Sequence, residues 1–162
     1  MSEIKVNLPK TKLAMKANLP NKEPDILKYW DTINLYELQK QTFSKREKFI
    51  LHDGPPYANG DIHIGTALNK VLKDIVVKFQ SVGLQKYSPY VPGWDCHGLP
   101  IEWKIEELNK KKGVDKTKLS VNEFRGQCRD FASKWIDIQK NQFKRLGVCL
   151  LYTSDAADDI PR

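Results

Sequence analysis

Residues 52–65, HDGPPYANGDIHIG, combine three glycines, two adjacent prolines and two histidines in fourteen positions, just before a helical pattern. Backbone N–H groups at a helix start are unpaired, and the helix dipole favours negative charge there. Gly60 and Gly65 carry no Cβ, so a ligand or another backbone segment can approach closely. The imidazole of His63 adds a donor within reach of a phosphate oxygen. The segment therefore predicts a phosphate-binding turn.

The same residues also have simpler structural explanations. A histidine next to a helix start is most often a cap or a surface residue, and Gly-Pro clusters are most often plain turns. The segment contains neither Gly-x-x-x-x-Gly-Lys-Ser/Thr nor Gly-x-Gly-x-x-Gly, which argues against a P-loop and a dinucleotide-binding loop. If this segment binds a nucleotide phosphate, it does so with a motif other than these two.

Two short segments flank this loop and the helix that follows it. Residues 48–53 predict a buried strand, and residues 86–95 predict a second strand in which Pro89 indicates an edge or a bulge. The helix between them is expected to end at Gly83. An apolar stripe runs down one face of this helix: Leu68, Val71, Leu72, Ile75, Val76 and Phe79. Such a βαβ unit has parallel strands, so both loops are expected to face each other on one side of the sheet.

The other segments are predicted to be extended or helical. Residues 1–21 predict an extended arm, and a helix of about four turns is expected from Pro24 to Leu38. A further helix is expected over residues 100–112, and a longer one begins at the capping box of residues 120–123 and ends at Gly147. The apolar positions of the longer helix are Val121, Phe124, Cys128, Phe131, Trp135 and Ile138.

Composition and charge narrow the class of protein. The 162 residues suit one compact domain, and 27 Lys and Arg against 20 Asp and Glu give a net charge of +7, which favours anionic partners. The three cysteines lack metal-site or disulfide spacing, and no apolar run approaches the roughly 20 residues that cross a bilayer. We therefore expect a cytoplasmic protein without membrane contact. Three lysines are interpreted as solvated charge, with an RNA-facing surface as the alternative: Lys70, Lys73 and Lys78.

The loop and two later blocks resemble a known family. Residues 52–65 are similar to the segment of class I aminoacyl-tRNA synthetases that carries their His-Ile-Gly-His motif at such a turn. YVPGWDCHGLPIE at residues 90–102 resembles the next block of that family, and RLGV at residues 145–148 extends the resemblance to Val148. The pairing of PPYANG with PGWDCHGLP is similar to the isoleucine-specific members. Valine- and leucine-specific members are the nearest alternatives.

This resemblance implies a fold and a reaction. The fold class would be α/β, with an arm and helix at residues 1–47 and the first half of a Rossmann-type catalytic domain, parallel strands with crossover helices, at residues 48–148. The isoleucine carboxylate would attack the α-phosphate of ATP, giving isoleucyl-adenylate, and tRNA(Ile) would accept the isoleucyl group. Mg²⁺ would accompany ATP, and the full-length protein would be a monomer. Positioning and charge stabilisation drive such a reaction, so no covalent nucleophile is needed.

The resemblance also implies roles in the ATP site. His63 would hydrogen-bond the triphosphate, Gly65 would make room for the adenosine, and Gly60 belongs to the same loop. Position 66 departs from the usual second histidine of the motif. The hydroxyl of Thr66 can still donate to a phosphate, but it is shorter and carries no charge. Alternatively, Thr66 caps the helix.

The amino-acid site is implied by two other matches. Asp95 matches the family aspartate that holds the α-ammonium of the amino acid, and charge pairing in a sheltered loop supports this role. Its structural alternative is an Asx turn that closes on His97. Gly54 and Pro55 match positions that line the isoleucine side-chain pocket, although these residues alone indicate only a turn.

Members of the family are several times longer than this sequence. A second ATP loop, an editing domain, anticodon-binding helices and the zinc-binding cysteines of some members are expected elsewhere, so we expect the chain alone not to aminoacylate tRNA. A free-standing nucleotide- or RNA-binding module is the alternative. Residues 149–162 no longer resemble the family, and most of them look like a translated transposase adapter of the kind used in sequencing libraries. An ordinary acidic tail is the alternative there.

Overall fold

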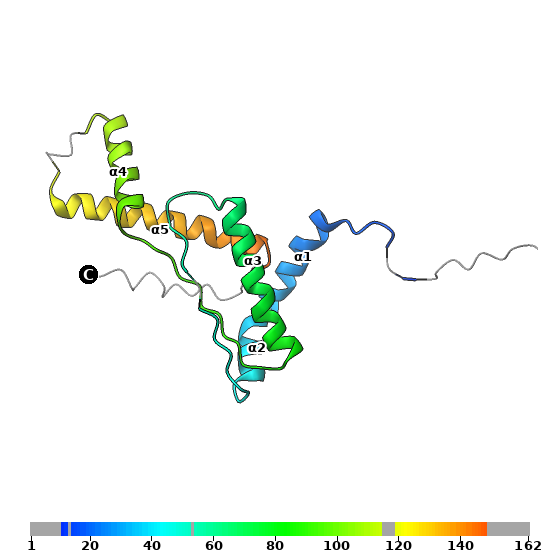
Figure 1. Ribbon diagram of the computed structural model, residues 1–162. Coiled ribbons are helices and arrows are strands. Elements are labelled where there is room, and N and C mark those ends of the chain that lie inside the picture. Colours follow the sequence, from blue (N-terminus) through cyan, green and yellow to red (C-terminus); the bar gives the residue numbers. More distant parts are fainter. Residues whose placement is uncertain (1–10, 13, 53, 115–118, 149–162) are drawn as a thin grey trace, which may run out of the picture.

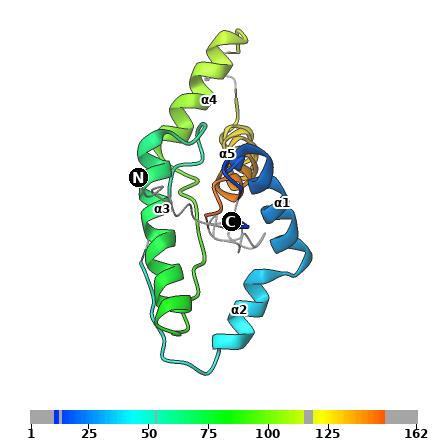
Figure 2. The same cartoon turned by 90° about the vertical axis from the view of Figure 1, so that its right-hand side faces the viewer.

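A computed structural model of the chain describes residues 11–12, 14–52, 54–114 and 119–148 (Figure 1). The predicted non-native tail and most of the predicted N-terminal arm lie outside these residues. The described part is mainly helical: α1 Leu19–Thr32, α2 Leu35–Phe43, α3 Ile64–Lys78 with the π-helical turn η1 Phe79–Gly83, α4 Leu99–Lys111 and α5 Val121–Arg145. Seen along α5, that helix lies between α3 and α1 (Figure 2). No helix of the described part is both long and apolar enough to span a membrane.

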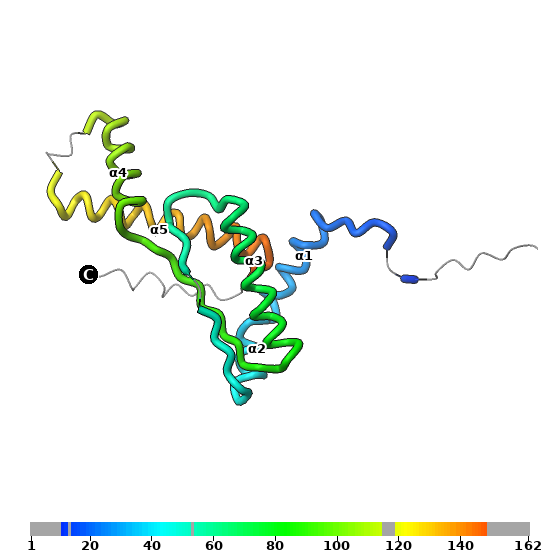
Figure 3. Tube along the Cα trace, viewed as in Figure 1, coloured from blue at the N-terminus to red at the C-terminus, as the bar shows by residue number. Residues whose placement is uncertain are grey.

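Neither predicted strand forms among the described residues. The segments before α3 and before α4 instead run side by side as extended chain (Figure 3). Two isolated parallel bridges join them, one between Lys48 and Tyr87 and one between Tyr57 and Asp95. The parallel direction is the one that a strand–helix–strand connection requires. The complete α/β arrangement stays a prediction.

Proline and a change of register explain why these bridges do not extend into strands. Pro55 and Pro56 in one segment, and Pro89 and Pro92 in the other, have no N–H to donate to a ladder. The two bridges are nine residues apart in the first segment, from 48 to 57, and eight in the second, from 87 to 95. The first segment therefore carries one extra residue between the bridges, which interrupts regular pairing.

α3 turns most of its predicted apolar stripe away from the rest of the described molecule, and of the stripe only Val71 packs against the apolar core described below. Ile75 is 56% exposed, and four other members of the stripe are exposed as well: Leu68, Leu72, Val76 and Phe79. The buried face carries Lys70, Asp74 and Val77 instead. The periodicity predicted the helix correctly, but not which face would be covered, because that depends on the neighbours available.

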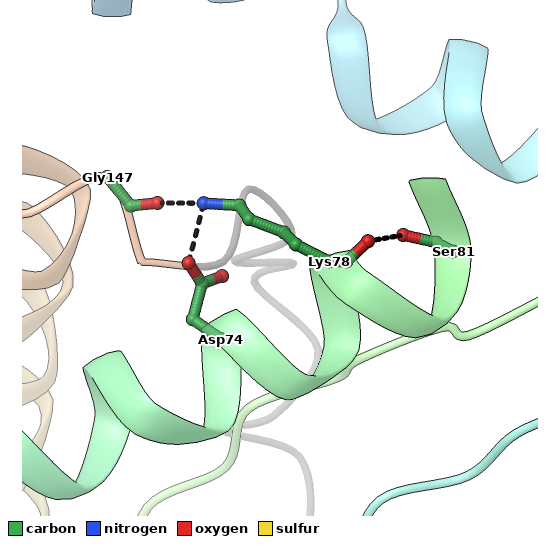
Figure 4. A network of polar contacts seen from close by, with 4 residues as sticks. All are labelled: Asp74, Lys78, Ser81 and Gly147. Carbon is green, nitrogen blue, oxygen red and sulfur yellow. Dashed lines mark hydrogen bonds and ion pairs between the residues drawn. The ribbon is translucent and has the colours of Figure 1, made fainter. Parts of the chain in front are cut away.

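A polar network holds the end of α3 against the end of α5. The ammonium of Lys78 lies 2.5 Å from Oδ2 of Asp74 and donates to the carbonyl oxygen of Gly147 at 2.7 Å (Figure 4). The hydroxyl of Ser81 donates to the carbonyl of Lys78. The helical run ends at Gly83, as predicted, but Gly83 is the last residue of η1 and not a left-handed C′ residue. The left-handed residue that follows is Gln85, with φ of 54°.

The apolar core lies where α3, α5 and the second extended segment meet. It contains Val77, Tyr90, Phe143 and Val148. α5 begins at the predicted capping box, in which Ser120 Oγ accepts from the N–H of Glu123 at 3.2 Å. Its buried residues are Ala132, Gln139 and Phe143, so its buried face differs from the predicted apolar positions.

The predicted first helix is two helices. α1 begins at Leu19, before the predicted start at Pro24, because Pro20 fits the first turn, where its missing N–H costs nothing. Pro24 therefore lies inside α1. Asn34 adopts a left-handed conformation, with φ of 46°, and separates α1 from α2.

Candidate functional site

His63 is the N-cap of α3. Its Nδ1 accepts hydrogen bonds from the backbone N–H groups of Gly65 at 3.1 Å and Thr66 at 3.3 Å. The capping alternative for His63 is thus what the structure contains. These two N–H groups, which would otherwise face an anion, are bound by the imidazole.

The imidazole of His63 also contacts the side chain of Thr66. Because Nδ1 accepts from two backbone donors, the proton of the neutral ring lies on Nε2. Nε2 is 3.1 Å from Oγ1 of Thr66, so it donates to that hydroxyl, whose own hydrogen can point outward. The alternative in which Thr66 caps the helix is wrong, since His63 makes the cap. The two residues form a linked pair at the start of α3.

Gly65 lies close to the imidazole. A Cβ at this position would lie 3.0 Å from Cε1 and 3.1 Å from Nδ1 of His63, so the ring would have to shift by a few tenths of an ångström. A Cβ at Gly54 or Gly60 would meet no atom within 4 Å in the part of the chain that the structure describes. Protein contacts therefore explain a glycine at 65, while those at 54 and 60 have room for a side chain.

A buried lysine lies behind the predicted amino-acid loop. Gly54 and Pro55 are exposed, and Nζ of Lys70 donates to the carbonyl oxygen of Gly54 at 3.4 Å. Lys70 is only 4% exposed, so its interpretation as solvated charge is wrong. The sequence signal was its spacing: Lys70, Asp74 and Val77 recur every three or four residues and share the buried face of α3.

Asp95 lies where the second extended segment pairs with the loop. Its N–H donates to the carbonyl of Pro56 at 2.9 Å, and its carbonyl accepts from the N–H of Ala58 at 3.1 Å. Its Oδ1 accepts from the backbone N–H of His97 at 3.4 Å and lies 3.7 Å from Nδ1 of the same residue. The Asx turn proposed as the alternative for Asp95 is therefore present. The carboxylate is 27% exposed, and both of its contacts are long.

A cavity of about 390 Å³ lies next to Asp95 in the sequence, since Cys96 is one of its lining residues. Residues of the 96–98 turn, α4 and α5 line it, whereas Asp95 and His63 do not. Burial raises the pKa of the Cys96 thiol, and the negative charge of Asp95 raises it further. Burial also raises the pKa of Cys128 in the same cavity. Both thiols are therefore weak nucleophiles at neutral pH.

Two glutamines of α5 that belong to no sequence motif contact the loop. Oε1 of Gln142 accepts from the N–H of Ile62 at 3.0 Å, and its Nε2 donates to Oδ1 of Asp61 at 2.6 Å. Gln139 bonds to both the loop and the second segment. The sequence signal for Gln139 was weak. It lies four residues before Phe143 on the same face of the helix, and a polar residue on a buried face indicates a buried hydrogen-bond partner.

The predicted site residues are brought together only in part. The backbone near Tyr57 pairs with Asp95, so the loop and the aspartate segment are neighbours. Within the described part of the chain, no hydrogen bond or ion pair joins the side chains of His63 and Asp95. Each side chain is held by residues close to it in sequence.

Comparisons with known proteins bear on this geometry. A family profile described as tRNA synthetases class I (I, L, M and V) matches residues 25–158. The chain is 63% identical over 148 residues to the isoleucine–tRNA ligase of Pelagibacter ubique, covering 91% of this chain and 16% of that protein. It is 58% identical over 143 residues to that of Sulfurihydrogenibium sp., and 57% over 143 residues to that of Persephonella marina, covering in each case 88% of this chain and 15% of the relative. The chain thus spans about one sixth of the length of the curated relatives it matches.

Proposed function

The chain belongs to the tRNA synthetases of class I (I, L, M and V), and we propose that the protein containing it is an isoleucine–tRNA ligase. The observation that carries the proposal is the identity of 56 to 63% to isoleucine–tRNA ligases, over about nine tenths of this chain. The reaction activates isoleucine with ATP and then acylates tRNA(Ile). The enzyme is a cytoplasmic monomer in this proposal.

The start of α3 is the proposed ATP side of the site. His63 Nε2 and the hydroxyl of Thr66 are 3.1 Å apart on the exposed first turn, where the helix dipole favours an anion. Nε2–H donates to Oγ1 of Thr66, and the hydroxyl hydrogen then donates to a phosphate oxygen. Gly65 leaves room for the imidazole in this position. Gly60 leaves space for the nucleotide, because no atom of the described residues lies within 4 Å of its missing Cβ.

ATP supplies the electrophilic α-phosphate, and the residues of this chain hold and orient it. Mg²⁺ keeps several waters and is commonly held through substrate phosphates. The donor set at the start of α3 fits an anion rather than a cation, so the chain's own part is to bind the phosphates. Threonine in place of the usual second histidine gives a neutral donor, which stabilises developing charge less than a cation does.

Asp95, Gly54 and Pro55 form the proposed isoleucine side. Among the described residues, the contacts of the Asp95 carboxylate are long ones to His97, at 3.4 and 3.7 Å, so an ammonium group can replace them with a shorter charge-assisted bond. Gly54 and Pro55 lie on the exposed loop, and the bridge between Tyr57 and Asp95 keeps this loop beside the aspartate.

We assign residues 1–47 to an arm and helices, residues 48–148 to part of a Rossmann-type α/β domain, and residues 149–162 to a non-native tail. The family profile extends to residue 158 and so includes part of this proposed tail. The tail assignment is therefore tested separately, by sequencing the genomic DNA downstream of codon 148. Native DNA that encodes the same residues 149–162 would refute it.

The function is tested with the product of the complete gene. We expect ATP–pyrophosphate exchange that depends on isoleucine and is much slower with valine or leucine, together with acylation of tRNA(Ile). Exchange driven best by valine or leucine would assign another member of the family. Nucleotide binding without exchange by any of the three amino acids would leave the free-standing binding module. The chain alone is expected to show no exchange.

A further inference from the structure

Gln139 joins the two segments of the candidate site through one side chain. Its Nε2 donates to the carbonyl oxygens of Tyr57 at 2.9 Å and Gly60 at 2.7 Å. Its Oε1 accepts from the indole N–H of Trp94 at 2.9 Å. The residue is 3% exposed, and these three bonds use both amide hydrogens and the carbonyl oxygen. A buried polar group so fully satisfied holds its partners firmly.

The partners of Gln139 lie on both sides of the proposed reaction. Tyr57 and Gly60 belong to the loop that leads to His63, and Trp94 directly precedes Asp95. The bridge between Tyr57 and Asp95 lies beside these contacts. Gln139 therefore sets the spacing between the loop that precedes the phosphate side and the segment that carries the ammonium side.

The helix that carries Gln139 is itself held in place. Phe143, one turn later, is in the apolar core with Val77 of α3, and the carbonyl of Gly147 accepts from Lys78 (Figure 4). Gln142 adds a second hold on the loop through Asp61 and the N–H of Ile62. α5 is thus held in place by the core, and its glutamines bind both the loop and the segment before Asp95.

Glutamine satisfies all three contacts, whereas the side chains closest to it in size do not. Glutamate keeps the acceptor for Trp94 but places carboxylate oxygens against two carbonyls, and methionine keeps the volume but removes all three bonds. Asparagine is one methylene shorter, so it cannot span the same partners. Position 139 therefore needs two donors and one acceptor at this reach.

We infer that Gln139 is a positioning residue for isoleucine activation: by tying the loop at Tyr57 and Gly60 to Trp94, it holds the proposed ATP and isoleucine sides in register. Gln139 touches neither proposed substrate, and its effect passes through the backbone of the loop and the segment before Asp95. The inference rests on the proposed function for the identity of the reaction. Its structural part is testable without any activity.

The structural part is tested by amide hydrogen exchange on the chain itself. The substitution Gln139→Met should speed exchange at the N–H groups of Ala58 and Asp95, which form the bridge beside Gln139, by about tenfold. The N–H groups of Phe49 and Tyr87 form the other bridge and should change by less than about twofold. Equal acceleration at both bridges, or none at Ala58 and Asp95, would overturn the inference.

Two further variants separate a local effect from general loosening. Trp94→Phe keeps an aromatic ring but removes the indole N–H together with part of the ring that packs against the core, and it should speed exchange at Asp95 while the chain keeps its helical circular dichroism. It decides the question if Gln139→Met does not fold. Asn141→Met is the matched control, because Asn141 is an exposed amide on the same helix, and its exchange pattern should equal that of the unaltered chain.

The catalytic part is tested in the product of the complete gene. Gln139→Met should lower kcat for isoleucine-dependent exchange by about 10- to 100-fold, because small misplacement of reacting groups is costly, while KM for ATP changes less than about threefold. Asn141→Met should leave both constants unchanged. An unchanged kcat in a protein whose bridge has opened would overturn the role in catalysis. If the unaltered protein shows no isoleucine-dependent ATP–pyrophosphate exchange, the proposed function and the role of Gln139 in catalysis both fail. Amide hydrogen exchange still tests whether Gln139 holds the loop against the segment before Asp95.

Discussion

Nε2 of His63 lies 3.1 Å from Oγ1 of Thr66, one turn later in α3, so the residue in place of the family's second histidine is bonded to the first. The imidazole N–H donates to the hydroxyl oxygen, and the hydrogen of the hydroxyl is then available to a ligand. One exposed turn therefore presents a linked hydroxyl donor instead of two separate imidazoles.

This relationship predicts the effect of removing the hydroxyl. In the complete protein, Thr66→Val should lower kcat/KM for ATP in the exchange assay by about tenfold, the value of one hydrogen bond to a charged group. Thr66→Ser keeps the hydroxyl and serves as the control. Thr66→His should retain or raise activity, since it restores the usual residue. Full activity in Thr66→Val would show that the hydroxyl does not contact the triphosphate.

Substitutions of His63 should separate capping from catalysis. Asparagine is a good N-cap but lacks a donor at the position of Nε2, so His63→Asn should keep the stability of the chain within about 0.5 kcal/mol. The same variant of the complete protein should lose about tenfold in kcat, because the hydroxyl of Thr66 then lacks the Nε2–H donor that turns its own hydrogen toward the phosphate. His63→Ala should also lower the unfolding free energy by about 1 kcal/mol, measured by urea denaturation. Equal kcat in the asparagine variant and the unaltered enzyme would contradict the role of Nε2.

The close approach of Gly65 to the imidazole gives a third prediction. Alanine is favoured over glycine in a helix by about 1 kcal/mol, but here its Cβ would displace the ring and cost a cap of similar size. Gly65→Ala should therefore change stability little and still reduce kcat/KM for ATP by at least about tenfold. Thermal unfolding and exchange kinetics of the same variant check both halves. A stabilised variant with full activity would mean that the ring does not need this space.

The environment of Cys96 predicts a pH dependence of its alkylation. Burial and the charge of Asp95 both raise the pKa of this thiol, so at neutral pH less of it is thiolate than in an unfolded peptide. Iodoacetamide should label Cys96 slowly, with a rate that rises at higher pH than for a free thiol. Asp95→Asn removes one of the two causes and should speed labelling of Cys96 a few-fold. Labelling of Cys128 is the internal control, because its raised pKa comes from burial, Glu102 and Glu106. Peptide mass spectrometry follows each cysteine.

Local sequence signals predicted much of this structure because their causes are local. The capping box at Ser120 and the glycine at 147, whose φ is +70°, determine where α5 begins and ends. The His63 turn likewise lies at the predicted helix start, and its alternative as a cap depends only on residues 63 to 66. Such features need no partner distant in sequence.

Features that depend on distant partners were not predicted. Gln139 lies about 80 residues from Tyr57 and Gly60, and no local pattern reveals that their carbonyls need its donors. The expected strands failed for a related reason, since pairing across two segments depends on how their prolines line up. Which face of α3 is buried depends on what packs against the helix. The network of Lys78 with Asp74 and Gly147 connects that face to the end of α5.

This orientation of α3 is itself testable with two neighbouring residues of similar size. Val77 is 8% exposed in the core with Phe143, whereas Ile75 is 56% exposed on the opposite face. Val77→Ala should lower the unfolding free energy of the chain by about 1 to 3 kcal/mol, because it removes buried methyl groups and leaves a cavity. Ile75→Ala should change it by less than about 0.5 kcal/mol, as is usual at exposed positions. Urea denaturation followed by circular dichroism measures both. The reverse order would mean that α3 buries its apolar stripe in solution and that the network around Lys78 does not determine which face is covered.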